Sequence, residues 1–230
     1  MSRPEVPRLA PCGFRSAFLS CPRPLAPLSS RHAGRHLPTE RSQKPSRLAR
    51  RVAVVGTTGS GKTTLSAALA SLLGVPHVEL DALAWGPAWV QVPYDLFRAR
   101  LEKTTRGDGW VVDGNYSRAR DLVWPRAEIV VWLDYPLRTV LGQLLRRTVR
   151  RVLTHEELWS GNRETLRTAL FNRDAILIWA LKTYWRRRRE YPELLSRPEH
   201  AHLQVVRHRS PRAAARWLAT LPRAHPPTPF

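Results

Sequence analysis

The sequence has few of the features that cross-link a chain or hold it in a membrane. Its 230 residues include only two cysteines, too few for the disulfide framework of a small secreted protein. The longest uninterrupted apolar run, Ala175–Leu181, has seven residues, whereas a membrane-spanning helix needs roughly 18–20. Acidic residues are scarce as well: 18 Asp and Glu stand against 38 Lys and Arg, for a net charge of +20. We therefore expect a basic, soluble, cytoplasmic protein with no membrane segment, and the composition excludes a collagen or an acidic disordered chain.

A regular hydrophobic pattern is missing from residues 1–49. This stretch holds 8 of the 20 prolines and both cysteines, and residues 1–51 contain 11 basic against 2 acidic side chains. Such a composition is typical of a disordered basic tail. It also fits a mis-called start codon or a transit peptide, although the prolines would break the amphipathic helix of the last. We expect the folded domain at residues 50–221 and a second disordered tail at residues 222–230.

From Arg51 onward, short β-branched runs alternate with helical patterns. The runs predict five strands, at Arg51–Val55, Pro76–Leu80, Trp110–Val112, Glu128–Leu133 and Leu203–Arg207. Apolar residues at helical spacing predict helices at Thr64–Leu73, Pro93–Arg106, Leu137–Val152 and Pro211–Leu221, with an interrupted helical pattern over Thr154–Tyr191. This alternation indicates an α/β fold in which a parallel sheet carries helices on both faces.

Between the first strand and the first helix lies GTTGSGKT, which fits the P-loop (Walker A) pattern G-x-x-x-x-G-K-[ST]. Its glycines allow a tight turn, and the N–H groups of Gly59–Thr63 can then point inward as a nest for anions at a helix N-terminus. Lys62 is expected to reach the β- and γ-phosphates of ATP, and the Thr63 hydroxyl to bind Mg²⁺. The residues expected to contact ATP are Gly56, Thr57, Thr58, Gly59, Ser60, Gly61, Lys62, Thr63 and Thr64.

Two aspartates follow predicted strands, and ligands of open parallel sheets bind beyond the carboxyl ends of the strands. Asp113 ends the third strand and is expected to hold Mg²⁺ through water. Asp81 ends the second strand and is expected to act as a general base or to orient an acceptor. For both residues, a helix cap or a turn is the structural alternative. Asp134, which precedes Pro136 at a strand-to-helix junction, is interpreted as a helix cap.

The helix predicted at Leu137–Val152 has an apolar face, which includes Leu145 and Val149, and a cluster of arginines opposite it. These arginines stand at four-residue spacing, where like charges repel, and an anionic ligand would remove that repulsion. They are Arg146, Arg147, Arg150 and Arg151. We expect Arg147 and Arg151 to stabilise the charge on a transferred phosphoryl group.

A helical lid is predicted at about residues 154–190, because phosphoryl transfer needs a cationic segment that closes over the reacting groups and excludes water. Residues 138–189 hold 13 basic against 4 acidic side chains. Within this region, Arg186–Arg189 are interpreted as a solvated basic face. Trp85 and Trp89 flank a Gly-Pro after Asp81, and they either wall an acceptor pocket or simply pack.

The chain resembles P-loop kinases of the adenylate kinase and shikimate kinase group, and most of all the adenylate-kinase-like ATPases known as DNA topology modulation proteins. The similar segments are GTTGSGKTT, VELDALAW, WVVDGNYSRARDLVWPRA, VVWLDYP, LLRRTVRR and ELWSGNRE, within Arg51–Leu221. The resemblance implies a three-layer P-loop fold with a five-stranded parallel sheet in the order 2-3-1-4-5, a helical lid, and ATP with Mg²⁺.

The same resemblance implies roles for individual residues. Asp113-Gly114 matches the acceptor side of adenylate kinases, but the arginine that holds the acceptor phosphate, here Arg118, stands one residue late. Gln143 stands where those kinases have an adenine-binding arginine, so only the phosphate role carries over, to Arg147. The loop with Arg209 and Pro211 resembles the one that borders adenine. The expected substrate contacts are Asp81, Trp85, Gly114, Asn115 and Arg118.

Three functions are compatible with these observations. The first is an ATP-dependent kinase that transfers the γ-phosphate to an unidentified small-molecule or nucleotide acceptor. The second is a nucleic-acid-associated ATPase, which the positive charge and the family favour. The third is a nucleotide-binding regulatory module with little turnover. The partners expected are ATP and the acceptor, and the chain is expected to be a monomer or a homodimer.

Overall fold

The computed structural model describes residues 49–154, 160 and 176–222, all of which belong to the unit Lys44–Phe230. The predicted tails, apart from Ala49 and Pro222, lie outside the described residues, as do positions 155–159 and 161–175 of the predicted lid. The domain limits at residues 50 and 221 and the lid therefore stay predictions.

Five parallel strands form one sheet in the order β2-β3-β1-β4-β5, which confirms the predicted fold class. They are β1 (Arg51–Gly56), β2 (His77–Glu79), β3 (Trp110–Asp113), β4 (Ile129–Leu133) and β5 (Gln204–His208). The side chains of β3 and β4 are buried throughout because helices cover both faces of the sheet, and this explains their continuous apolar sequences. Strand β1 pairs with both β3 and β4, so the P-loop that follows it leaves from the middle of the sheet.

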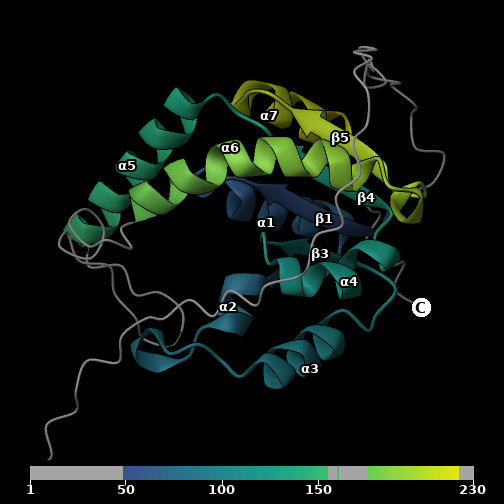
Figure 1. Ribbon diagram of the computed structural model, residues 1–230. Coiled ribbons are helices and arrows are strands. Elements are labelled where there is room, and N and C mark those ends of the chain that lie inside the picture. The colour runs from purple at the N-terminus through teal and green to yellow at the C-terminus, as the bar shows by residue number, and fades with distance from the viewer. Residues whose placement is uncertain (1–48, 155–159, 161–175, 223–230) are drawn as a thin grey trace, which may run out of the picture. The chain divides into compact units, whose positions relative to one another are not determined.

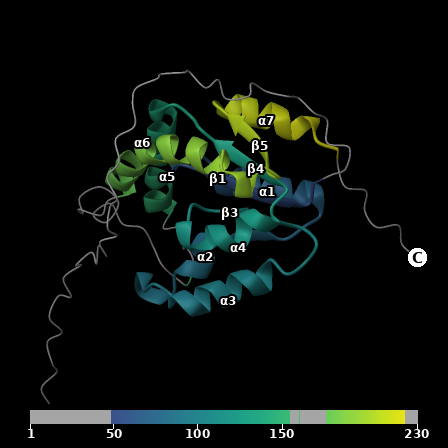
Figure 2. The same ribbon diagram turned by 45° about the vertical axis from the view of Figure 1, so that its right-hand side comes forward.

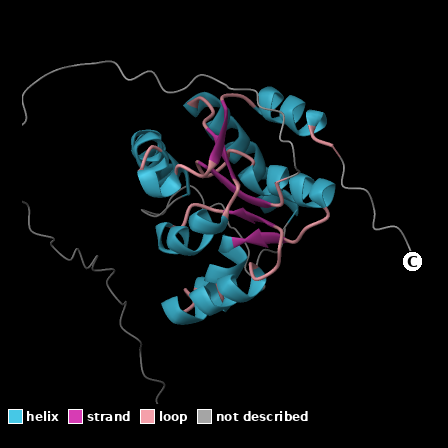
Figure 3. Cartoon of the chain, turned by 90° about the vertical axis from the view of Figure 1, so that its right-hand side faces the viewer, coloured by secondary structure: helices cyan, strands magenta, loops and turns pink. Residues whose placement is uncertain are grey.

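Helices lie on both sides of the strands, as Figure 3 shows. They are α1 (Lys62–Leu73), α2 (Leu80–Ala84), α3 (Tyr94–Thr104), α4 (Arg120–Val123), α5 (Leu137–Thr154), α6 (Ile176–Leu195) and α7 (Pro211–Thr220). Helices α2 and α4 are absent from the prediction because five and four residues are too few to show a helical period. Among the described residues, no helix has both the length and the apolarity needed to cross a membrane.

The two faces of the sheet build separate hydrophobic cores. Phe97 of α3 and Trp110 of β3 are fully buried in one core, and Leu69 of α1 is buried in the other. Helix α6 contributes Tyr184 to the second core and Tyr191 to the first, so it crosses the sheet near the carboxyl ends of the strands. Figures 1 and 2 show α6 passing the strands beside α5. The region where ligands of open parallel sheets bind is therefore bordered by α6.

Helix α5 packs directly on the P-loop. A Cβ built on Gly59 would lie 2.8 Å from the Cβ of Leu144, so only glycine permits this approach. Leu144 is fully buried, but Leu145 and Val149, predicted on the same apolar face, are 50% and 44% exposed. These two residues of the predicted apolar face therefore lie outside the core, because the core takes up only a narrow stripe of the helix.

Asp134 ties three elements together and is not a helix cap. Its buried carboxylate accepts a hydrogen bond from Arg207 Nε of β5 at 3.0 Å and pairs with Arg188 Nε of α6 at 2.9 Å. Helix α5 begins only at Leu137, so Asp134 stands too far ahead to cap it. The capping interpretation is therefore wrong, and the carboxylate instead holds α6 and β5 at the end of β4.

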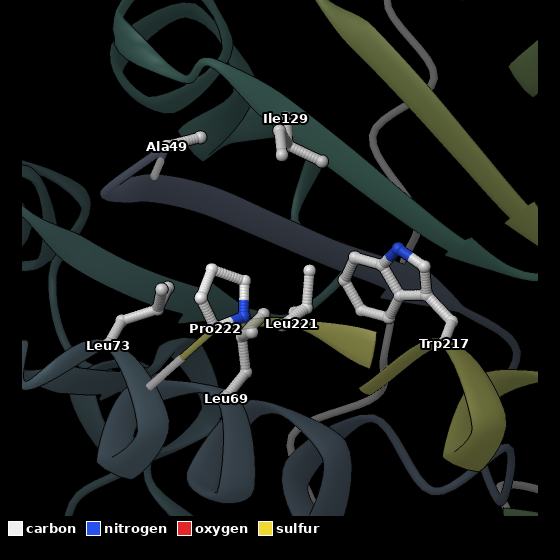
Figure 4. A pocket seen from close by; sticks show the side chains of 7 residues that line it. All are labelled: Ala49, Leu69, Leu73, Ile129, Trp217, Leu221 and Pro222. Carbon is white, nitrogen blue, oxygen red and sulfur yellow. The ribbon is translucent and has the colours of Figure 1, made fainter. Parts of the chain in front are cut away.

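A small apolar cavity marks the opposite end of the sheet, at the amino ends of the strands. Figure 4 shows its apolar lining, which comes from α1, α7 and the starts of β1 and β4. The lining residues are Ala49, Leu69, Leu73, Ile129, Trp217, Leu221 and Pro222. The cavity presents no group suited to proton or phosphoryl transfer, so it belongs to the packing of the second core.

Replacing Asp134 by alanine should lower the free energy of unfolding by about 3 kcal/mol, the lower end of the range for a broken buried ion pair, because both arginine partners are partly exposed. Urea denaturation measures this loss. Asp108→Ala, in an exposed loop, is the control and should change stability by less than about 0.5 kcal/mol. Equally small losses in both variants would contradict the role of Asp134.

Candidate active site

The P-loop forms a cradle for anions at the N-terminus of α1. Gly59 and Gly61 have φ angles of 84° and 80°, which allow successive N–H groups to face one side. Lys62 donates a hydrogen bond from Nζ to the carbonyl of Thr57 at 3.2 Å, so its ammonium folds back over the loop. The Ser60 hydroxyl is buried without a partner in the described part of the chain. A nest of main-chain N–H groups at a helix N-terminus fits the phosphates of a nucleotide.

Charged groups from four other elements act on Lys62. Burial, followed by the positive charge of Arg187, lowers the pKa of Lys62 to about 8. The negative charges of Asp113 and Asp81 oppose this change, and the positive charge of Arg147 adds to it. The structure thus brings together three residues predicted from the sequence, from α2, β3 and α5, around the P-loop lysine.

Arg187 of α6 is a site residue that the sequence analysis missed. It is only 7% exposed, and burial lowers the pKa of its guanidinium. Its Nη1 has no hydrogen-bond partner among the described residues. A buried N–H without a partner costs about 1–3 kcal/mol, which an anion bound beside Lys62 would offset.

The prediction of a solvated face at Arg186–Arg189 is therefore wrong at Arg187, and also at Arg188, which pairs with Asp134. Successive residues of a helix point about 100° apart, so four in a row cover every side of it. A helix that packs against a sheet must then turn one of the four inward. The sequence therefore indicated that one of these arginines is buried, but it did not show which of them faces the site.

Asp81 is held by a tyrosine that the prediction did not include. The Tyr116 hydroxyl donates a hydrogen bond to Asp81 Oδ1 at 2.6 Å. Burial, then the charge of Asp81 and this hydrogen bond, raise the pKa of Tyr116, so the hydroxyl keeps its proton and remains a donor. Trp85, a predicted substrate contact, also hydrogen-bonds to the Tyr116 hydroxyl. The carboxylate is thus oriented through one oxygen.

Asp113, the predicted magnesium residue, is already paired with a histidine. His77 Nε2 donates to Asp113 Oδ2 at 3.1 Å, and this hydrogen bond raises the pKa of His77. Thr63, the other predicted metal ligand, is exposed in the first turn of α1. The described residues contain no cluster of three His, Cys, Asp or Glu side chains placed to hold a metal ion. The magnesium roles of Thr63 and Asp113 stay predictions.

The loop after β3, in which acceptor contacts were predicted, contacts the start of the P-loop. Gly114 has a φ of 140°, and a Cβ there would lie 2.8 Å from the Cβ of Leu80. Asn115, predicted to contact the acceptor, directs both ends of its amide to the main chain of Gly56. This arrangement gives Asn115 a structural partner, and its substrate contact stays a prediction.

Arg118 lies over two aromatic rings. Its guanidinium carbon is 4.9 Å from the ring centre of Phe97 and 5.5 Å from that of Tyr116. Its Nη2 is buried with no partner in the described residues. Arg118 therefore stands beside the residue that orients Asp81, with an N–H still able to bind an anion.

The remaining predicted residues have no demonstrated role in the site. Trp85 meets Trp89 edge to face, with ring centres 6.1 Å apart, and Trp89 is 39% exposed. Arg151 is partly buried on α5, Arg209 is exposed after β5, and Pro211 begins α7. Their contacts with ATP or acceptor stay predictions.

No model of a protein family and no curated protein sequence matches the chain. Solved structures with a similar fold include shikimate kinase from Bacteroides thetaiotaomicron, at 15% identity and a TM-score of 0.44 over 74% of this chain and 94% of that one. Shikimate kinase from Acinetobacter baumannii in complex with shikimate has 19% identity and a TM-score of 0.46 over 75% and 90% of the two chains. A gluconokinase from Sinorhizobium meliloti 1021 has 19% identity and a TM-score of 0.42 over 75% and 93%. These likenesses concern the fold alone, and its assignment rests on the strand order and the P-loop.

Nucleotide binding should weaken as the pH rises through the pKa of Lys62. Phosphates favour the charged ammonium, so above a pKa of about 8 binding must take up a proton, and affinity falls. We expect MgATP affinity to fall roughly tenfold between pH 7 and pH 9 in titration calorimetry. The Lys62→Arg variant keeps its charge over this range, and any MgATP binding that it retains should change much less with pH. A wild-type affinity for MgATP that does not change between pH 7 and pH 9 would contradict the role of Lys62 in binding the phosphates.

Proposed function

We propose that the protein is an ATP-dependent phosphotransferase that transfers the γ-phosphoryl group of ATP to a hydroxyl of a small, negatively charged acceptor. The main support is that a carboxylate, Asp81, and a buried guanidinium, Arg187, both act on the P-loop lysine, Lys62. Nucleotide binding alone would not need an oriented carboxylate at this place. A kinase needs it to accept a proton from the attacking hydroxyl.

In the proposed reaction, Asp81 accepts the hydroxyl proton of the acceptor while the acceptor oxygen forms a bond to the γ-phosphorus. The bond from that phosphorus to the β-phosphate oxygen breaks, and ADP leaves with the electron pair. Because Tyr116 donates to Oδ1 of Asp81, Oδ2 is the oxygen that takes the proton. Lys62, with Arg147 and Arg151 of α5, offsets the negative charge on the transferred group.

The acceptor class follows from the guanidinium of Arg118. Its Nη2 is a buried atom without a hydrogen-bond partner in the described residues. A carboxylate or phosphate on the acceptor would satisfy it. A hydroxy acid or a phosphorylated alcohol supplies both a hydroxyl that can be phosphorylated and an anionic group for the guanidinium. A nucleoside monophosphate instead attacks through its phosphate, so it brings no hydroxyl proton for Asp81.

Magnesium would be held by the Thr63 hydroxyl and, through water, by Asp113. Both are oxygen ligands of the kind that Mg²⁺ prefers. When bound, the ion would neutralise part of the negative charge of the phosphates. His77 would fix the orientation of Asp113 as an outer hydrogen-bond partner.

Two alternatives remain within the same site. A nucleic-acid-associated ATPase of the DNA topology modulation type would hydrolyse ATP faster when DNA is added. A regulatory module would bind ATP and turn it over little with any acceptor. The assay that tests the kinase also distinguishes these alternatives.

ADP formation from MgATP by the full chain should rise at least about 100-fold with one acceptor from a panel of hydroxy acids, such as shikimate and gluconate, and phosphorylated alcohols. Nucleoside monophosphates and DNA complete the panel, and Lys62→Ala is the blank. A response to nucleoside monophosphates alone, or to DNA alone, would contradict the proposal.

Asp81→Asn should lower kcat about 10²–10⁴-fold with the active acceptor, because it removes the proton acceptor and keeps the shape. Its affinity for MgATP should stay within about threefold of the wild type. Asp108→Asn, in an exposed loop, is the matched control and should leave kcat unchanged. Equal kcat values for Asp81→Asn and the wild type would rule out the general base.

A further inference from the structure

Asn115 holds the residue from which the P-loop departs. Its amide oxygen accepts a hydrogen bond from the Gly56 N–H at 3.0 Å, and its amide nitrogen donates to the Gly56 carbonyl. The side chain thereby pairs with the main chain much as a neighbouring strand would. Gly56 has a φ of 154°, and a Cβ there would lie 2.7 Å from the carbonyl oxygen of Leu133. Asn115 therefore holds the main chain of Gly56 in a conformation that residues other than glycine rarely adopt.

Tyr191 connects the same amide to α6. Its hydroxyl donates a hydrogen bond to Asn115 Oδ1 at 2.8 Å. The ring is 3% exposed and meets Trp132 edge to face, with the centres 5.6 Å apart, so the core sets its position. Burial raises the pKa of the Tyr191 hydroxyl, which therefore keeps its proton. One amide thus joins the end of β1, the loop after β3 and helix α6.

Arg187 stands four residues before Tyr191 on α6, which places both side chains on the same face of the helix. Arg187 is close enough to Lys62 for its charge to lower that pKa, and its Nη1 has no partner in the described residues. A rotation or slide of α6 would therefore move Arg187 away from the P-loop. Displacements of about 1 Å are enough to lose a phosphate contact.

We infer that Tyr191 is a positioning residue for nucleotide binding: through Asn115 it sets α6 against the P-loop and so places Arg187 for the phosphates. The inference rests on the ATP site of the proposed function. It adds a hydrogen-bond chain, Tyr191–Asn115–Gly56, whose members need not touch the reacting atoms. Tyr191 then acts on the nucleotide through Arg187 rather than through a contact of its own.

A double-mutant cycle on MgATP affinity tests this inference. The dissociation constant is measured by titration calorimetry on the full chain, for the wild type, Tyr191→Phe, Arg187→Met and the double variant. Arg187→Met should weaken binding about tenfold or more, as expected for a hydrogen bond to a charged group. Tyr191→Phe alone, with Arg187 present, should weaken MgATP binding about threefold to tenfold. In the Arg187→Met background it should change the constant less than about twofold, because no guanidinium is left to position.

Tyr94→Phe is the matched control, since it removes the hydroxyl of an exposed tyrosine on α3. It should leave the dissociation constant unchanged. A purely structural role of Tyr191 would lower the melting temperature and weaken binding equally in both backgrounds. That result, or no effect of Tyr191→Phe on affinity, overturns the inference and leaves the proposed function standing. If the wild-type chain binds no MgATP, the proposed function and the inference are both wrong.

Discussion

Positive charge buried beside the P-loop is the constraint on which the rest of the site depends. Lys62 is partly buried and Arg187 is 7% exposed; burial, and then the charge of the guanidinium, lowers the pKa of the ammonium. Two like charges in one poorly hydrated space destabilise the folded state unless anions lie nearby. Asp81 and Asp113 supply part of that compensation, and phosphates would supply the rest. The folded chain therefore holds positive charge at this place before any ligand binds.

Helix α6 supplies the second of these charges and is held at two points along its length. Arg188 pairs with Asp134 at the end of β4, and Tyr191 donates to Asn115 after β3. Arg187 directly precedes Arg188 and stands four residues before Tyr191, so these contacts limit how far its guanidinium can move. Preorganisation of this kind lowers the cost of ordering a cation when a nucleotide binds.

The strands, the longer helices and the P-loop were predictable because their signals are local. Strand β4 is a continuous apolar run, and the P-loop stands between a strand and a helix, so both are recognisable without any distant contact. Asp81 and Asp113 were expected near Lys62 because the carboxyl ends of parallel strands meet at one edge. Short helices such as α2, and the exposure of Leu145, depend on neighbours that no local pattern records.

The order of the strands followed from the family resemblance. The anion cradle followed from the closely spaced glycines, lysine and hydroxyl residues of the P-loop motif. Folding alone decided which of the four arginines at Arg186–Arg189 faces Lys62, since a charged run looks alike on every side of a helix. The rotation of α6 comes from contacts with Asp134 and Asn115, which lie far away in the sequence. The direction of a side chain is thus decided by packing over long separations, whereas the glycines that permit the positive φ angles of the P-loop are present in the local sequence.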